Sequence, residues 1–200
     1  MNVSQAVFVT SSAEADRVPA FDGPEYAFIG RSNVGKSSLI NALCRTRIAK
    51  TSQTPGKTQL INHFRINDNW YLVDLPGYGY ARTSKVQRAG FSRLIASYIL
   101  TRRNLATVFV LVDARHAPLK SDLEFIRWLG ENGIPLAVCL TKADKLTRGA
   151  LAKNTAGYRA ALAGEWEELP PLMVTSSVTG AGIDQILDYI ERTNKELSTI

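Results

Sequence analysis

The chain has 200 residues and a mass of 22.0 kDa, with 45% hydrophobic and 21% charged residues, so we expect one folded domain with a sizeable core and not a disordered or fibrous protein. Its apolar runs are far shorter than the roughly 20 residues of a membrane span, and its start lacks the basic stretch of a secretory signal. Two cysteines, Cys44 and Cys139, are too few for a disulfide framework or a zinc site.

The net charge of +6 is unevenly distributed along the chain. Residues 1–100 carry 12 basic and 6 acidic side chains, whereas residues 101–200 carry 12 of each. Between Arg31 and Arg103 there are 13 basic residues and only two acidic ones, Asp68 and Asp74, which is a local balance of +11. We expect a segment with so few acids to face an anionic partner.

Short apolar, β-branched runs alternate with helical patterns along the chain. The first half predicts, in chain order, a strand at Tyr26–Gly30, a helix starting at Ser37–Leu43, strands at Gln59–Ile66 and Trp70–Asp74, and a helix at Phe91–Leu100. The second half predicts a strand at Thr107–Asp113, a helix at Leu123–Leu129, a strand at Pro135–Leu140, a helix at Leu146–Ala163, a strand at Leu172–Thr175 and a helix at Ile183–Arg192.

This alternation predicts an α/β domain with a mostly parallel six-stranded sheet and helices on both faces. The turn Asn67-Asp68-Asn69 joins two of the strands as a hairpin, which adds one antiparallel edge strand. No linker is long enough to separate two domains, so we expect residues 1–200 to form one domain. Residues 1–24 are expected to be an N-terminal extension ahead of the first core strand.

A phosphate-binding pattern, G-x-x-x-x-G-K-[ST], lies between the first predicted strand and helix. Its glycines let backbone N–H groups point at phosphate oxygens, and the helix N-terminus adds its positive dipole end. We expect Lys36 to reach the β- and γ-phosphates and the Ser37 hydroxyl to bind Mg²⁺. The whole loop is predicted to contact the nucleotide, namely Gly30, Arg31, Ser32, Asn33, Val34, Gly35, Lys36, Ser37 and Ser38.

A second short motif, Asp74-Leu75-Pro76-Gly77, closes the predicted strand at Trp70–Asp74. A carboxylate at that position can hold Mg²⁺ beside the phosphates. Gly77 lets the backbone approach closely enough for its N–H to donate to a γ-phosphate. Alone, D-x-x-G also marks ordinary turns, but after a phosphate loop and at a strand end it favours a nucleotide site.

The third motif, Thr141-Lys142-Ala143-Asp144, predicts the base. The Asp144 carboxylate can accept both the N1–H and the 2-amino group of guanine, whereas adenine would leave it unpaired, at a cost of about 1–3 kcal/mol. Asp144 therefore argues against an ATP-dependent enzyme, and the stem of Lys142 can cover the base. A fourth segment, Thr175, Ser176 and Ser177, offers backbone N–H groups to the guanine carbonyl, or else caps the last helix.

These motifs resemble the translation-factor-like branch of P-loop GTPases. The segments GRSNVGKSS, TPGKTQL, DLPGYGYA and TKADK resemble, more closely still, the EngB (YihA/YsxC) family, over a span from about Phe8 to Ile190. The resemblance implies a cytoplasmic bacterial GTPase that binds GTP or GDP with Mg²⁺. It also implies a role in assembly of the large (50S) ribosomal subunit and in normal cell division.

By the same resemblance, the first switch is Gly56, Lys57, Thr58, Gln59 and Leu60. Its Thr58 is then a Mg²⁺ ligand beside Ser37 and Asp74, although the residues alone leave Thr51, Thr54 and Thr58 open. A threonine suits this place because its hydroxyl can bind Mg²⁺ while its N–H binds the γ-phosphate. We expect the catalytic contacts to come from Lys36, Thr58 and Gly77.

Tyr78 occupies the position where Ras-like GTPases carry the glutamine that orients the attacking water. A phenol with an ordinary pKa of about 10 is a poor base, so we expect slow intrinsic hydrolysis. Related GTPases with asparagine at the position of Asn33 use K⁺, which makes Asn33 a candidate K⁺ ligand. The alternative is that Asn33 only suits the backbone turn of the loop.

The basic residues that the nucleotide does not use form a predicted surface for ribosomal RNA on the large-subunit precursor. They are Arg45, Arg47, Lys50, Arg65, Arg82, Lys85, Arg88, Arg93, Arg102 and Arg103. Tyr78 and Tyr80 could stack on bases there or pack on the helix at Phe91–Leu100. We expect a monomeric switch, with a nucleotide-gated RNA-binding module whose hydrolysis is incidental as the rival function.

Overall fold

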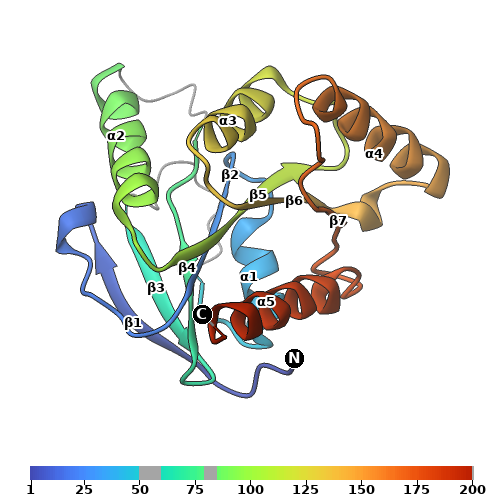
Figure 1. Ribbon diagram of the computed structural model, residues 1–200. Coiled ribbons are helices and arrows are strands. Elements are labelled where there is room, and N and C mark those ends of the chain that lie inside the picture. The colour runs from blue at the N-terminus through green and yellow to red at the C-terminus, as the bar shows by residue number, and fades with distance from the viewer. Residues whose placement is uncertain (50–59, 79–84, 200) are drawn as a thin grey trace.

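A computed structural model of the chain describes residues 1–49, 60–78 and 85–199, and the side chains of 85–92 lie outside that description. A seven-stranded sheet is covered by helices on both faces, as Figure 1 shows, which confirms the α/β class. The strands are β1 (Ala6–Ser12), β2 (Glu25–Gly30), β3 (Ile61–Ile66), β4 (Trp70–Asp74), β5 (Leu105–Asp113), β6 (Leu136–Thr141) and β7 (Leu172–Val174). The helices are α1 (Lys36–Cys44), α2 (Lys85–Thr101), α3 (Lys120–Glu131), α4 (Arg148–Ala163) and α5 (Ile183–Leu197).

The strands lie in the order β1-β3-β4-β2-β5-β6-β7. β2 pairs in parallel with β4 and β5, and the pairs β5–β6 and β6–β7 are parallel as well. β3 runs antiparallel to both of its neighbours, β1 and β4. The parallel strands from β4 to β7 therefore all end at the same edge of the sheet, where ligands of open α/β sheets bind.

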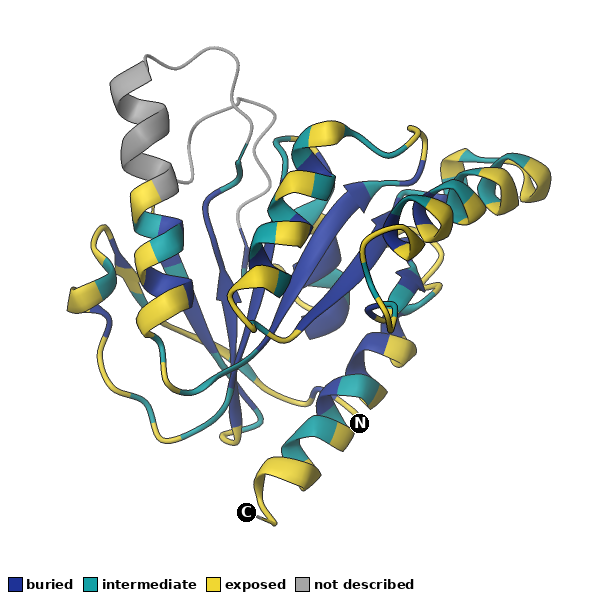
Figure 2. Ribbon diagram, turned by 45° about the horizontal axis from the view of Figure 1, so that its top comes forward, coloured by how far each residue is buried: buried dark blue, intermediate teal, exposed yellow. Residues whose placement is uncertain are grey.

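Alternate residues of each strand fill two separate apolar cores. In β2, Tyr26 and Phe28 pack with α1 and α5, whereas Ala27 and Ile29 pack with α2, α3 and α4. The central strands are buried on both faces, and they are dark blue in Figure 2. Double burial explains why β2 and β5 are nearly continuous apolar runs in the sequence. Among the described helices, none is both long enough and apolar enough to cross a membrane.

The first strand, β1, corrects the predicted sheet. The prediction of six strands with one antiparallel edge strand is wrong in its count, because β1 lies outside β3 as a seventh strand and takes the edge position. Residues 1–24, expected to be an extension, thus contribute a strand to the sheet. Val7, Phe8 and Val9 of β1 are consecutive apolar residues that are 47%, 55% and 39% exposed. The sequence of β1 therefore lacks the alternation of apolar and polar residues that indicates a strand with one buried face.

The predicted hairpin turn between β3 and β4 is confirmed. Asn67 and Asp68 have φ values of +49° and +53°, as a type I′ turn requires. The Asn67 side-chain oxygen also accepts hydrogen bonds from the backbone N–H groups of Ser4 and Gln5, at 2.9 and 3.1 Å. The turn therefore also fixes the chain that leads into β1.

A buried ionic cluster joins β2, β3 and the end of α2. Glu25 is fully buried and accepts hydrogen bonds from Arg102 Nε, at 2.9 Å to each carboxylate oxygen, and from the Tyr98 hydroxyl. His63 lies 3.8 Å from the same carboxylate. Burial alone raises the pKa of Glu25, but the hydrogen bonds of His63, Arg102 and Tyr98 outweigh it and lower the pKa to about 2. The prediction that Arg102 belongs to the RNA-binding surface is therefore wrong, because its side chain is hydrogen-bonded to Glu25.

Candidate functional site

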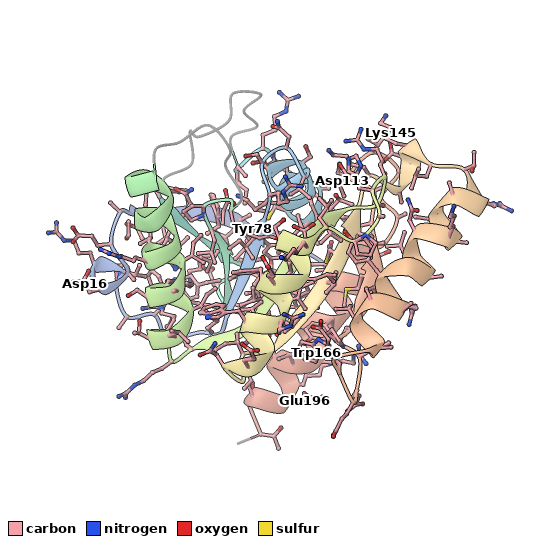
Figure 3. The ribbon with its side chains drawn as sticks, turned by 90° about the horizontal axis from the view of Figure 1, so that it is seen from above. Asp16, Tyr78, Asp113, Lys145, Trp166 and Glu196 are labelled. Atoms are coloured by element: carbon pink, nitrogen blue, oxygen red, sulfur yellow. The ribbon has the colours of Figure 1, made fainter. Side chains whose placement is uncertain are left out.

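The predicted motifs converge at the edge where the parallel strands end. The phosphate loop follows β2, Asp74 ends β4, Thr141 ends β6 and Thr175 follows β7. In Figure 3, Tyr78, Asp113 and Lys145 lie in the upper part of the view, whereas Trp166 and Glu196 lie in the lower part. The topology thus brings together segments that are more than 100 residues apart in the chain.

The phosphate loop has the backbone of an anion-binding site. Gly35 is the N-cap of α1 with a φ of +101°, a conformation that side chains with a Cβ rarely adopt. Asn33 has a φ of +59°, in the left-handed region that asparagine tolerates better than most residues. The Ser32 Oγ is buried without a hydrogen-bond partner among the described residues, which suits a loop whose polar groups await a phosphate.

Lys36 and Asp74 form an ion pair at the centre of the site. The Lys36 ammonium donates to the Asp74 carboxylate, and their side chains are only 10% and 5% exposed. Ser37 is the next residue of α1. Carboxylate and hydroxyl oxygens are hard ligands that suit Mg²⁺ together with phosphates, so this donor set fits the metal that the family resemblance implies.

The third motif is tied to the phosphate loop. The Thr141 hydroxyl donates to the backbone oxygen of Val34 at 2.6 Å. The Lys142 ammonium donates to the backbone oxygen of Asn33 at 2.5 Å and to the Asp113 carboxylate at 2.9 Å. Lys142 therefore spans from β6 to the phosphate loop, over the nucleotide side of the sheet.

Asp113, which the sequence analysis did not single out, lies among the predicted site residues through its bond from Lys142. Its carboxylate also binds the Arg115 guanidinium through two hydrogen bonds, at 2.9 and 2.7 Å. Partial burial raises the pKa of Asp113, but the bonds from Arg115 and Lys142 outweigh it and hold the pKa well below its ordinary value. Its position at the end of β5, on the edge where the motifs meet, is the feature from which it could have been predicted.

Asp144 is held by the segment that follows β7. The Ser176 hydroxyl donates to Asp144 Oδ1 at 2.7 Å, and that bond, with a smaller contribution from Lys145, lowers the pKa of Asp144. Ser176 in turn is fixed by the N–H groups of Val178 and Thr179, at 3.2 Å each. The carboxylate is therefore ionised and oriented, as an acceptor for two donors of a base must be.

Gly77 lies against the phosphate loop. A Cβ at Gly77 would come within 2.9 Å of the Gly30 oxygen, so only glycine fits without a shift. Leu75 and Pro76 before it are buried. Tyr78 stacks on Phe125 of α3, a contact that the sequence did not predict. The predicted switch residues 56–59, with Thr51, Thr54 and Tyr80, lie outside the described residues, whereas Leu60 is described and exposed.

The fold and these loops define a P-loop GTPase. Residues 25–142 match the family model described as "50S ribosome-binding GTPase". The chain is 56% identical to the "Probable GTP-binding protein EngB" of Porphyromonas gingivalis over 200 residues, which is the full length of both chains. It is 54% identical to the protein of the same name from Bacteroides fragilis, again over the full length of both. The chain belongs to the EngB family of GTP-binding proteins.

Solved structures agree with this assignment at the level of the fold. A crystal structure of a probable GTP-binding protein engB matches with a TM-score of 0.70 and 23% identity, over 86% of this chain and 99% of that one. A GDP-bound mutant of NFeoB from S. thermophilus matches with a TM-score of 0.57 and 26% identity, over 82% of this chain and 58% of that one. The chain therefore has a P-loop GTPase fold.

Proposed function

We propose that this GTPase is a cytoplasmic, monomeric switch that assists assembly of the large (50S) ribosomal subunit and is needed for normal cell division. The observation that carries the proposal is the match over residues 25–142 to a family described as 50S ribosome-binding GTPases. The local balance of +11 between Arg31 and Arg103 supports an RNA partner, because phosphate contacts dominate such binding.

Within that proposal, each loop around the site binds a different part of the nucleotide. The phosphate loop and Lys36 hold the phosphates, Gly77 N–H donates to the γ-phosphate, and Asp144 reads guanine. Ser37, Thr58 and Asp74 would hold Mg²⁺, which would supply charge stabilisation for phosphoryl transfer. When phosphate and Mg²⁺ are bound, Lys36 would pair with the phosphates and Asp74 with the metal, because each partner suits the charge of its side chain.

A K⁺ ion at Asn33 belongs to the same proposal. The left-handed backbone of Asn33 is also what the simpler alternative requires, in which the residue only suits the turn. Faster turnover in K⁺ than in Na⁺ at equal ionic strength would support the ion, and identical rates would exclude it.

The structure describes part of the predicted basic surface. Arg45, Arg47, Arg93 and Arg103 are exposed. Arg65 instead pairs with Asp68, at 3.5 Å. Lys50 and Arg82 lie outside the described residues, as do the side chains of Lys85 and Arg88. The first four arginines are therefore the described candidates for contacts to RNA phosphates.

Binding to isolated large-subunit particles tests the proposal. With a non-hydrolysable GTP analogue we expect tighter binding than with GDP, and affinity should fall steeply as salt rises, because phosphate contacts release counterions. Binding that is indifferent to the nucleotide would contradict a switch. Single-turnover hydrolysis on the same particles addresses the rival function: stimulation supports a GTPase cycle, and no change favours an RNA-binding module with incidental hydrolysis.

Asp144→Asn tests the base assignment. An amide presents a donor where the carboxylate accepts from the 2-amino group of guanine, so we expect GDP affinity to fall by about 10- to 100-fold, in line with the cost of about 1–3 kcal/mol for an unpaired buried group. Xanthosine diphosphate, which has an oxygen at that position, should bind the variant better than GDP does.

The matched control for this change is Asp184→Asn on α5, which is exposed and should leave the affinity for GDP unchanged. Both variants are titrated with GDP and xanthosine diphosphate by fluorescence. Unaltered preference for GDP in Asp144→Asn would overturn the assignment of guanine recognition to this carboxylate.

A further inference from the structure

Tyr78, the residue after Gly77, is turned away from the phosphate loop toward α3. Its hydroxyl donates to Asp122 Oδ1 at 3.2 Å. Its ring stacks on Phe125 with a centroid distance of 4.8 Å and an interplanar angle of 27°. The side chain is thus held at two points by one helix, and its hydroxyl is committed to a carboxylate instead of to water at the nucleotide.

The backbone of Tyr78 is held from the opposite side, by the phosphate loop. Its N–H donates to the Gly30 oxygen at 3.3 Å, and Arg31 and Tyr78 form a parallel β-bridge. The Cβ position of Gly77 lies 2.9 Å from the same Gly30 oxygen. The peptide between Gly77 and Tyr78 is therefore fastened between the phosphate loop and α3.

The residue that accepts this bond, Asp122, is a buried acidic residue. It lies in the first turn of α3 and is only 2% exposed. A buried carboxylate is costly unless it is hydrogen-bonded, and the Tyr78 hydroxyl supplies such a bond. Burial, with the neighbouring Asp122 carboxylate, raises the pKa of Tyr78 well above its ordinary value, so the phenol keeps its proton and remains a donor at neutral pH.

We propose that Tyr78 and Asp122 form a latch that positions the Gly77–Tyr78 backbone for the γ-phosphate, and that both are positioning residues for recognition of GTP over GDP. This inference rests on the proposed role of the Gly77 N–H. GTP and GDP differ only in the γ-phosphate, so a displaced donor at Gly77 weakens binding of GTP and leaves GDP unaffected. Hydrogen bonds weaken steeply with distance and misalignment, so a small displacement of the backbone is enough.

The test compares variants that break the latch with one that preserves it. Tyr78→Phe removes the hydroxyl and keeps the ring on Phe125, Asp122→Ala removes the acceptor, and Asp122→Asn keeps an acceptor oxygen. For the first two we expect the affinity for a non-hydrolysable GTP analogue to fall about fivefold to tenfold while that for GDP stays within about twofold. Asp122→Asn should remain near wild type, and Tyr78→Phe/Asp122→Ala should lose no more than the worse single variant.

Tyr158→Phe is the matched control. Tyr158 is also buried, and its hydroxyl has no hydrogen-bond partner among the described residues, so its loss should change neither nucleotide affinity. Thermal unfolding of every variant shows whether it is folded at the temperature of the titration. Single-turnover hydrolysis supplies a second readout, in which the latch variants should lose rate at saturating GTP.

The outcomes separate the latch from a structural role and from the role of Gly77. Equal weakening of analogue and GDP, or additive losses in the double variant, would overturn the latch. Gly77→Ala is the reference: if it lowers analogue affinity while Tyr78→Phe and Asp122→Ala do not, the latch is wrong and the proposed phosphate contact stands. If Gly77→Ala also leaves the ratio unchanged, the proposed contact itself fails.

Discussion

Replacing Lys36 by alanine is expected to weaken the binding of GTP by about a hundredfold or more and that of GDP by about tenfold or more. The Lys36 ammonium, at the start of α1, pairs with Asp74 beside the phosphate loop, and the Lys36 side chain is 10% exposed. Hydrogen bonds to charged groups contribute about 1.5–3 kcal/mol each, and GTP loses the bonds to both its β- and γ-phosphates, whereas GDP loses only the first. Titration with fluorescent GDP and a GTP analogue measures the effect.

The matched control for Lys36→Ala is Lys120→Ala. Both lysines are the first residue of a helix, α1 and α3, but Lys120 is 90% exposed and pairs only with Glu124, at 3.6 Å. We expect Lys120→Ala to leave nucleotide binding unchanged. If the Lys36→Ala protein binds GDP as the wild type does, the assignment of the phosphate loop to the nucleotide site is wrong.

Lys36→Ala also leaves the Asp74 carboxylate buried without its cation. Part of any loss could therefore come from unfolding, because breaking a buried ion pair is strongly destabilising. The variant Lys36→Ala/Asp74→Asn removes both charges and should regain much of the stability without regaining nucleotide binding. Urea unfolding and nucleotide titration of the same preparations distinguish the two effects.

Arg102→Ala is expected to lower the free energy of unfolding by about 3–5 kcal/mol, the usual cost of removing one partner of a buried ion pair. Its guanidinium binds both oxygens of Glu25, which is fully buried, and also donates to the Pro19 oxygen at 2.7 Å. Without Arg102, that carboxylate keeps the hydrogen bonds of Tyr98 and Asn104 and the His63 ring at 3.8 Å. Urea unfolding at pH 7 measures the loss.

Arg103→Ala is the control, because Arg103 is the next residue and is exposed. It should change stability by no more than about 0.5 kcal/mol, as surface substitutions do. Equal losses for the two variants would contradict an important role for the buried pair.

The same pair predicts a pH dependence. The pKa of Glu25 is lowered from its ordinary value of 4.5 to about 2 in the folded protein, so its ionised form stabilises the fold above pH 4.5, and this contribution is lost as the pH falls toward 2. Arg102→Ala removes one of the hydrogen bonds that lower this pKa and leaves those of His63 and Tyr98. The difference in stability between wild type and variant should therefore shrink over the same pH interval.

Local chemistry explains why much of the candidate site could be predicted from the sequence. The phosphate loop, D-x-x-G and T-K-x-D each need particular residue types at fixed spacing, and each follows an apolar strand. The strands themselves were predicted because parallel, doubly buried strands are continuous apolar runs. β1 was missed because its apolar residues are exposed at an edge and pair with a strand about 50 residues further on.

The sequence by itself determined the class of fold, the phosphate loop and the residues proposed to bind guanine, because these depend on spacing along the chain. Only the tertiary structure decided which charges are available: Arg102 is used by Glu25, Lys142 by Asp113 and Tyr78 by Asp122. Each of these pairs joins residues that are 29 to 77 positions apart. A charge or hydroxyl is free or committed according to its neighbours in space, and spacing along the chain does not contain that information.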